Sequence, residues 1–199
     1  MPVPAESFAG GDGSEENPFQ ISTPEELYRF SYVMDPTNFD LHDEEFAVEF
    51  RKMHYVLTED IALNDVSDYD NWLQNAPENG WAPISSFQGL LGGAGRAISG
   101  LYCYEYRTRH GEAAGLFNSI IPGAVVENLN LDKCMIIATS SGAGAITESA
   151  SGAYIQNYSV NGTVMGHVYA VILQVCLTIQ LFRTVNSMVK WEGIAMQAV

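Results

Sequence analysis

Basic residues are scarce in this chain of 199 amino acids. Nine lysine and arginine residues stand against 24 aspartate and glutamate residues, which gives a formal net charge of −15 at pH 7. Because such a surface repels phosphate groups, the charge balance argues against nucleic-acid binding and against attachment to an anionic membrane. A cation or a neutral sugar is the more natural ligand.

Cysteine is also rare, and its three positions form no CxxC pair. The odd number and the wide spacing indicate neither a zinc site nor a disulfide framework. We therefore expect Cys103, Cys134 and Cys176 to be small, buried, apolar side chains.

Sequence motifs of catalysis are missing as well. The chain has no GxSxG elbow and no zincin spacing among its histidines, and its glycine-rich stretch, residues 87–102, lacks the spacing of a phosphate-binding loop. We expect neither an enzyme nor a cofactor. A polysaccharide lyase or hydrolase is the alternative, but it needs paired acids on one face, and Glu127, Asp132 and Glu148 fall at non-equivalent positions.

Targeting and membrane-spanning segments are not evident either. The first residues lack the basic and apolar regions of a signal peptide, which indicates a cytoplasmic protein or a missing start. The apolar run at residues 168–182 is shorter than the roughly 20 residues that cross a bilayer. We expect no transmembrane segment.

What the chain does contain is one pattern written twice, 29 residues apart, as from Gly115 to Gly144. A period in this range indicates supersecondary units that stack on their neighbours. A looser third copy aligns Ile98 with Val126. The residues that carry the two copies are Gly115, Leu116, Phe117, Gly123, Asn128, Leu129 and Leu131 in the first, and Gly144, Ile146, Gly152, Ile155, Asn157 and Val160 in the second.

Short strands between glycine corners predict a mainly β chain built as a parallel solenoid. Leu129 and Leu131 are two positions apart, so in a strand they share one face and can stack on the next copy. Asn128 and Asn157 fall at equivalent positions. We expect them at a corner with left-handed backbone, where their amides could form a ladder.

A helix is predicted just before the β region. Thr23 is a typical N-cap, Pro24 fits the first helical position, and Glu26 completes a capping box. Leu27 and Phe30 give the helix an apolar face, and we expect it to cover the open first end of the stack. Residues 54–58 and 60–63 read as two short strands.

The loop that follows contains two candidate ligand sites. Asp65, Asp68 and Asp70 place three hard oxygen donors close together, which makes them weak calcium candidates. Trp72 and Trp81 offer indole rings that could stack on a sugar, although such residues more often pin a loop to the core.

Several motifs together resemble a known family. Gly115-Leu116-Phe117-Asn118 resembles the GLUG motif of bacterial surface repeats, with Asn118 in place of the second glycine. Residues 87–102 resemble the stretch that precedes those repeats, and residues 8–30 resemble their leader. The resemblance implies a right-handed parallel β-helix of adhesin-like, cell-surface or secreted proteins, without cofactor or catalytic residues.

The chain therefore divides into four predicted regions. For the last of them two interpretations stay open, a cap or a frameshifted or truncated end, because its composition changes abruptly. The regions are a lead-in loop at 1–22, a capping region of a helix and short strands at 23–85, GLUG-like β-helix repeats at 86–164, and an atypical apolar tail at 165–199.

The expected function is that of a non-enzymatic structural or adhesive module of a bacterial cell-surface or secreted protein. A surface ligand or carbohydrate is the expected partner, and self-association through the exposed end of the stack is a further expectation. The alternatives are a polysaccharide-active enzyme and a non-functional fragment of a longer repeat protein.

Overall fold

The computed structural model describes residues 8–34, 48–104, 114–139, 142–166, 170–171, 180–184 and 188–190. The described part is mainly β. In chain order its elements are β1 (Phe19–Ile21), α1 (Pro24–Met34), β2 (His54–Leu57), β3 (Ile61–Ala62), the 3-10 helix η3 (Tyr69–Asn71), β4 (Leu90–Gly92), β5 (Ala97–Ser99), β6 (Tyr102–Tyr104), β7 (Phe117–Ile120), β8 (Val125–Glu127), β9 (Asn130–Ile137), β10 (Ala143–Gly144), β11 (Thr147–Ala150), β12 (Tyr154–Gln156), β13 (Ser159–Met165), β14 (Ala170–Val171), β15 (Gln180–Thr184) and β16 (Met188–Lys190).

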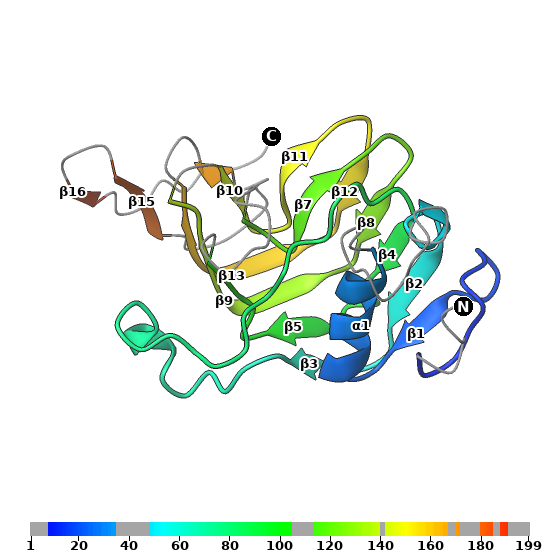
Figure 1. Cartoon of the computed structure of the whole chain (residues 1–199), viewed down its shortest axis with the longest axis horizontal. Helices are drawn as coiled ribbons and strands as arrows, with labels where there is room; N and C mark the ends of the chain where they lie inside the picture. The colour runs from blue at the N-terminus through cyan, green and yellow to red at the C-terminus, as the bar shows by residue number, and fades with distance from the viewer. Residues whose placement is uncertain are drawn as a thin grey trace.

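The strands form several parallel sheets whose neighbours come from distant parts of the chain (Figure 1). One sheet has five strands in the order β1-β2-β4-β8-β12. A second has seven strands, in the order β16-β15-β13-β9-β5-β3 with β6 also paired to β9. Two-stranded sheets are formed by β7 with β11 and by β10 with β14. The pair of β15 and β16 is antiparallel.

The prediction of a mainly β chain is confirmed, but the prediction of a right-handed parallel β-helix is wrong. The strands belong to separate sheets of unequal size, and the seven-stranded sheet curves as a half-barrel that ends in an antiparallel pair. No single repeat describes the chain, because Leu91 pairs with Val126 at an offset of 35 and Val126 pairs with Ile155 at an offset of 29.

The looser third copy is also corrected by the register. Ile98 pairs with Leu131, and Val126 pairs with Leu91. The reason is that Ile98 lies in β5 of the seven-stranded sheet, whereas Val126 lies in β8 of the five-stranded sheet. Residues 93–96 join β4 to β5, whereas only residues 128–129 join β8 to β9. Because the first corner is two residues longer, the offset between paired residues falls from 35 for Leu91 and Val126 to 33 for Ile98 and Leu131.

Helix α1 begins as the sequence predicts. The Glu26 amide donates to Thr23 Oγ1 at 3.2 Å, and the Thr23 amide donates to Glu26 Oε2 at 3.1 Å, so the capping box is confirmed. Leu27, Phe30 and Val33 are fully buried. The Phe30 ring lies 4.5 Å from the Tyr55 ring, centroid to centroid. Figure 1 shows α1 lying across the strands near the N-terminal end of the sheets.

The main core lies between the large sheets. Side chains alternate along each strand, so every second residue points into this core. In the five-stranded sheet Tyr55, Leu91 and Val126 face inward and are fully buried. In the seven-stranded sheet the inward row continues from Ile98 to Leu131, which is 1% exposed, and on to Val160. Burying each aliphatic side chain contributes about 1.5 to 3 kcal/mol.

A second apolar cluster lies outside the main core, where the loop around η3 packs on the seven-stranded sheet. Trp72, Tyr102, Met135 and Ile137 are its buried members. The Tyr69 hydroxyl ties the loop to the sheet. It donates to the Cys134 carbonyl oxygen at 2.7 Å and lies 3.1 Å from Thr163 Oγ1. The loop is therefore held by both packing and hydrogen bonds.

Tyr69→Phe is expected to lower the free energy of unfolding by about 1 to 2 kcal/mol, because the variant loses these hydrogen bonds but keeps the ring. Chemical denaturation followed by circular dichroism measures the change. Tyr154→Phe is the matched control, since Tyr154 is 69% exposed and its loss of a hydroxyl should leave stability unchanged. Equal stability of the two variants would contradict a structural role for the Tyr69 hydroxyl.

Strands of the predicted tail extend the sheets of the preceding repeat. β14 pairs with β10, and β15 pairs with β13. Most of the apolar run at 168–182 lies outside the described residues. Among the residues that are described, no helix has the length and apolar character needed to span a bilayer.

Candidate functional site

The five-stranded sheet presents one broad face away from the core, which we call the outer sheet face. It is defined by the residues that alternate along each strand with the inward-facing ones. Register places them in two rows across the strands. The first row is His54, Leu90, Val125 and Tyr154, and the second is Gln20, Val56, Gly92, Glu127 and Gln156.

One end of the outer sheet face is polar and exposed. Tyr154 is 69% exposed, the largest exposed fraction among the big apolar side chains of the described residues. Two positions along the same strand, Gln156 Nε2 donates to Glu127 Oε2 at 2.7 Å. A flat aromatic ring beside an amide and a carboxylate can pack on the apolar face of a sugar and accept or donate hydrogen bonds at its hydroxyls.

Similar side-chain pairs join β9 to β13 on the neighbouring sheet. Ser159 Oγ donates to Asn130 Oδ1 at 2.7 Å, and Asn161 Nδ2 donates to Asp132 Oδ1 at 2.7 Å. All these pairs are 29 residues apart and follow the register of the repeat. They hold the surface side chains in fixed positions, which reduces the conformational entropy that ligand binding would otherwise cost.

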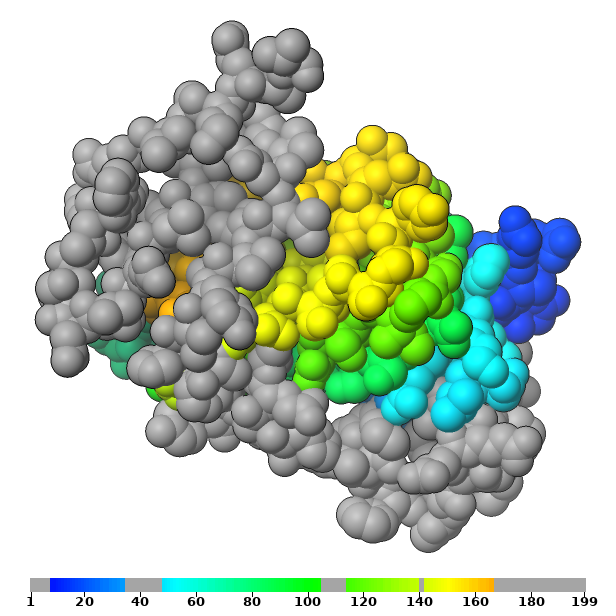
Figure 2. Space-filling view, turned by 90° about the horizontal axis from the view of Figure 1, so that it is seen from above, coloured from blue at the N-terminus to red at the C-terminus, as the bar shows by residue number. Residues whose placement is uncertain are grey.

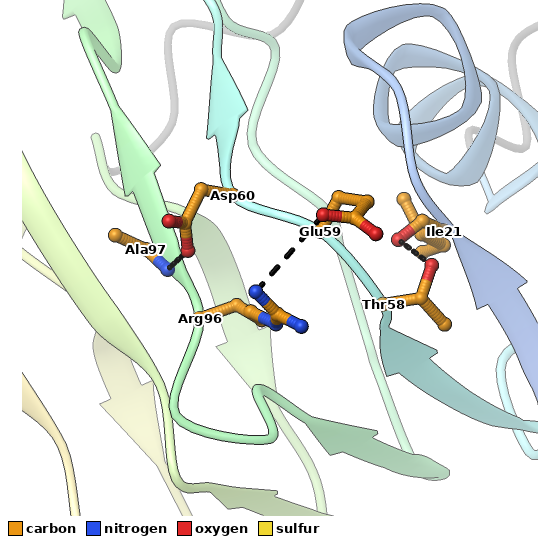
Figure 3. Close-up of polar contacts among 6 residues, drawn as sticks. All are labelled: Ile21, Thr58, Glu59, Asp60, Arg96 and Ala97. Carbon is orange, nitrogen blue, oxygen red and sulfur yellow. Dashed lines mark hydrogen bonds and ion pairs between the residues drawn. The ribbon is translucent and has the colours of Figure 1, made fainter.

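The corner between the large sheets is fixed by polar contacts at its N-terminal end. Figure 3 shows Asp60 Oδ1 accepting the Ala97 amide at 2.9 Å, beside Arg96 Nη1 at 4.0 Å from Glu59 Oε2. Thr58 Oγ1 donates to the Ile21 carbonyl oxygen at 3.4 Å in the same view. The ion pair is exposed and contributes little stability. Asp60 and Glu59 therefore hold neighbouring segments of the chain together at this corner.

The predicted calcium candidates lie in the loop that packs on the seven-stranded sheet. Asp65 Oδ1 accepts the Ser67 amide at 2.9 Å, and this hydrogen bond lowers the pKa of the Asp65 carboxyl. Asp68 accepts from the side-chain amides of Asn71 and Asn75. Nowhere in the described ranges do three His, Cys, Asp or Glu side chains form a group that could hold a metal ion, so Asp65, Asp68 and Asp70 are not brought together.

The two tryptophans of the same region serve as structural anchors. Trp72 and Trp81 are each 2% exposed. The Trp81 indole Nε1 donates to the Leu116 carbonyl oxygen at 3.0 Å. The interpretation that they pin a loop to the core is confirmed, and neither indole is accessible for stacking on a sugar.

The repeat residues of the two copies lie at equivalent places, except that Phe117 pairs with Thr147 and not with the predicted Ile146. Asn128 and Asn157 have φ of 54° and 51°, as expected of a left-handed corner, but no hydrogen bond joins their side-chain amides among the contacts of the described residues. Instead the main-chain N–H of Asn128 donates a hydrogen bond to the main-chain carbonyl oxygen of Gln156 at 3.2 Å. Of the other repeat residues, Ile155 is half-buried, and those that are buried are Leu116, Phe117, Leu129, Leu131, Ile146 and Val160. Gly123 and Gly152 have positive φ. Gly115 and Gly144 lie so close to backbone oxygens that a Cβ would clash.

Cys103 and Cys134 are free and buried, as predicted, and Cys176 lies outside the described residues. Burial raises the pKa of the Cys134 thiol to about 12. At neutral pH this side chain is therefore a protonated thiol, which is a poor nucleophile and a poor metal ligand.

Sequence reasoning missed the outer sheet face because its members belong to strands of different repeats. Tyr154 and Glu127 become neighbours only through the register of β8 and β12. The signal that could have found them is the alternation within each strand, since Tyr154 and Gln156 flank the apolar Ile155.

Comparisons with known proteins give no family for this chain. No protein-family model matches it, and searches of curated proteins and of solved structures found no significant similarity.

Proposed function

We propose that the chain is a non-enzymatic adhesive module of a bacterial cell-surface or secreted protein, and that it binds a neutral carbohydrate on the outer sheet face. The observation that carries this proposal is the exposed Tyr154 beside the hydrogen-bonded pair of Glu127 and Gln156. The resemblance of short motifs in residues 8–30, 87–102 and 115–118 to those of GLUG repeat proteins is the reason for proposing the adhesive role and the extracellular location.

The rows of the outer sheet face suit an extended polymer. Neighbouring strands lie about 4.8 Å apart, so a chain of sugars laid across them meets side chains at regular intervals. The half-buried Leu90 and Val125 and the exposed Tyr154 supply apolar surface along one row. The net charge of −15 favours an uncharged polymer, since an acidic polysaccharide would be repelled.

The contacts of the acids support a structural and binding role. Glu127 accepts from Gln156, and Asp132 accepts from Asn161. Asp60 accepts from the main chain at the corner. Their oxygens hold the surface in place, and catalysis by paired acids would need carboxyl groups facing one another across a substrate.

Self-association through the end of the second repeat is also part of this proposal. The second repeat, residues 143–165, lies at the surface of the molecule in Figure 2, where its segment is coloured yellow to orange. An adhesive module that presents several copies of one binding face gains apparent affinity without a new contact.

A panel of neutral and acidic polysaccharides tests the proposal, with binding measured by isothermal titration calorimetry. Tyr154→Ala is expected to weaken binding of a neutral polymer about tenfold or more, because a buried aromatic contact of roughly 1.4 kcal/mol is lost. Leu73→Ala is the matched control, since Leu73 is 55% exposed but lies in the loop over the other sheet.

Two results would contradict the proposal. In one, Tyr154→Ala leaves the affinity for every bound polymer unchanged. In the other, incubation with the bound polymer releases new reducing ends, which would show a hydrolase.

A further inference from the structure

Strand β12 has an unpaired edge in the described part of the chain. Of the other three strands of the second repeat, β10 pairs with β14 and β13 with β15, whereas β11, like β12, has no following partner among the described strands. β12 pairs with β8. The Tyr154 amide donates to the Ala124 carbonyl oxygen, and the Gln156 carbonyl oxygen accepts the Asn128 amide. In a parallel ladder the N–H and C=O of the residue between them, Ile155, therefore point away from β8.

This edge carries no charge. Residues 149–165 contain no Asp, Glu, Lys, Arg or His, although the chain as a whole has a net charge of −15. Natural proteins usually protect strand edges with charged side chains, above all lysine. Because like-charged molecules repel one another, an approach through this uncharged segment is electrostatically the least costly. Figure 2 shows the segment on the surface of the molecule.

The opposite edge of the same sheet is closed. The Ala9 amide donates to the Gln20 carbonyl oxygen at 3.0 Å, and the Gln20 amide donates to the Gly10 carbonyl oxygen at 2.8 Å. This antiparallel bridge between Gly10 and Gln20 covers the outer side of β1. A head-to-tail stack, with β12 of one molecule on β1 of the next, is therefore blocked. Within the described five-stranded sheet, a second molecule can therefore pair only through the edge of β12.

We propose that two molecules pair β12 to β12, antiparallel, about a two-fold axis at Ile155. The two Ile155 residues then exchange two N–H···O=C hydrogen bonds. Tyr154 lies opposite Gln156 of the second molecule, and both side chains are on the outer sheet face. The two five-stranded sheets become one, and each ligand-binding end gains polar groups from the other molecule.

This inference deepens the self-association that belongs to the proposed function, and it is tested on the full chain by sedimentation velocity over a range of concentrations. The wild type is expected to form a dimer, with a doubling of mass. Ile155→Pro should be a monomer, because proline removes the N–H that faces the second molecule, which the β8 pairing does not use. Ile155→Val keeps this N–H and should remain a dimer.

Circular dichroism establishes whether Ile155→Pro is folded. If it is not, hydrogen exchange of the wild type decides instead. The Ile155 amide should then exchange roughly tenfold more slowly in the concentrated dimer than after dilution. A wild type that is monomeric at all concentrations, a folded Ile155→Pro dimer, or an Ile155 amide whose exchange does not change on dilution would overturn the pairing.

Titration of the same samples with the neutral polysaccharide separates this inference from the proposed function. A monomer that binds the polymer overturns the pairing alone. A dimer that depends on the Ile155 amide but binds no polymer overturns the carbohydrate proposal alone.

Discussion

Leu131→Asp is expected to abolish the folded state of the repeats. Leu131 is 1% exposed and stacks in register between Ile98 and Val160 on adjacent strands. The change removes about 2 to 3 kcal/mol of apolar burial and adds several kcal/mol for an unpaired buried carboxylate. Together these costs approach the whole stability of a typical domain, about 5 to 15 kcal/mol. Thermal unfolding followed by far-UV circular dichroism measures the loss.

The pH dependence of this variant gives a second check. Burial raises the pKa of an aspartate above its unfolded value of about 3.9, so the folded state binds the proton more tightly. Whatever stability the variant keeps is therefore present at low pH and lost as the pH rises through the raised folded pKa.

Leu131→Met is the matched control for this experiment. Methionine conserves the volume and apolar character of the side chain, so the expected loss is under about 1.5 kcal/mol. A melting curve of Leu131→Asp that matches the wild type would show that Leu131 does not belong to the core.

Features set by neighbouring residues could be predicted from the sequence. The capping box of α1 needs only Thr23 and Glu26, three positions apart, and both hydrogen bonds are present. The strands at residues 54–58 and 60–63 correspond to β2 and β3. In each case the local pattern decides the structure, because the partners are joined by a short piece of chain.

Features set by the register between distant strands could not be predicted. Ile98 lies beside Leu131 and not beside the expected partner Val126, because β5 and β8 belong to different sheets. Val126 and Leu131 are both buried aliphatic residues within strands, so either could stack on Ile98. Hydrophobic alternation alone therefore cannot distinguish the observed pairing from the expected one.

The residues of the candidate site could not be identified from the sequence for the same reason. Tyr154, Glu127 and Gln156 meet because β8 and β12 pair in one register, which the 29-residue spacing of the repeat does indicate. Which of these side chains faces outward depends on how the corners turn the chain. The aspartates at 65, 68 and 70 were conspicuous in the sequence, but their loop folds so that Asp65 and Asp68 bind local groups.

The second prediction with a large expected effect on stability concerns the start of the corner at residues 93–96. It compares substitutions of Gly93 and of the preceding Gly92. A Cβ on Gly93 would lie 2.2 Å from the Asn128 carbonyl oxygen and 2.5 Å from Leu129 Cα. These are backbone atoms of the next corner, and they are fixed by the Gly93 amide, which donates to the Glu127 carbonyl oxygen at 2.7 Å. Relief of the clash therefore requires the two corners to separate.

Gly93→Ala is accordingly expected to lower the free energy of unfolding by about 3 kcal/mol or more, since overpacking against backbone cannot be relieved by a rotamer change. A Cβ on Gly92 would meet Leu90 Cδ2 at 3.6 Å, an ordinary contact, so Gly92→Ala should stay within about 1 kcal/mol of the wild type. Urea denaturation of both variants measures the difference. Equal stabilities would mean that the corners do not approach as closely as the register of β4 and β8 requires, and the stacking of the two large sheets would then need a different register.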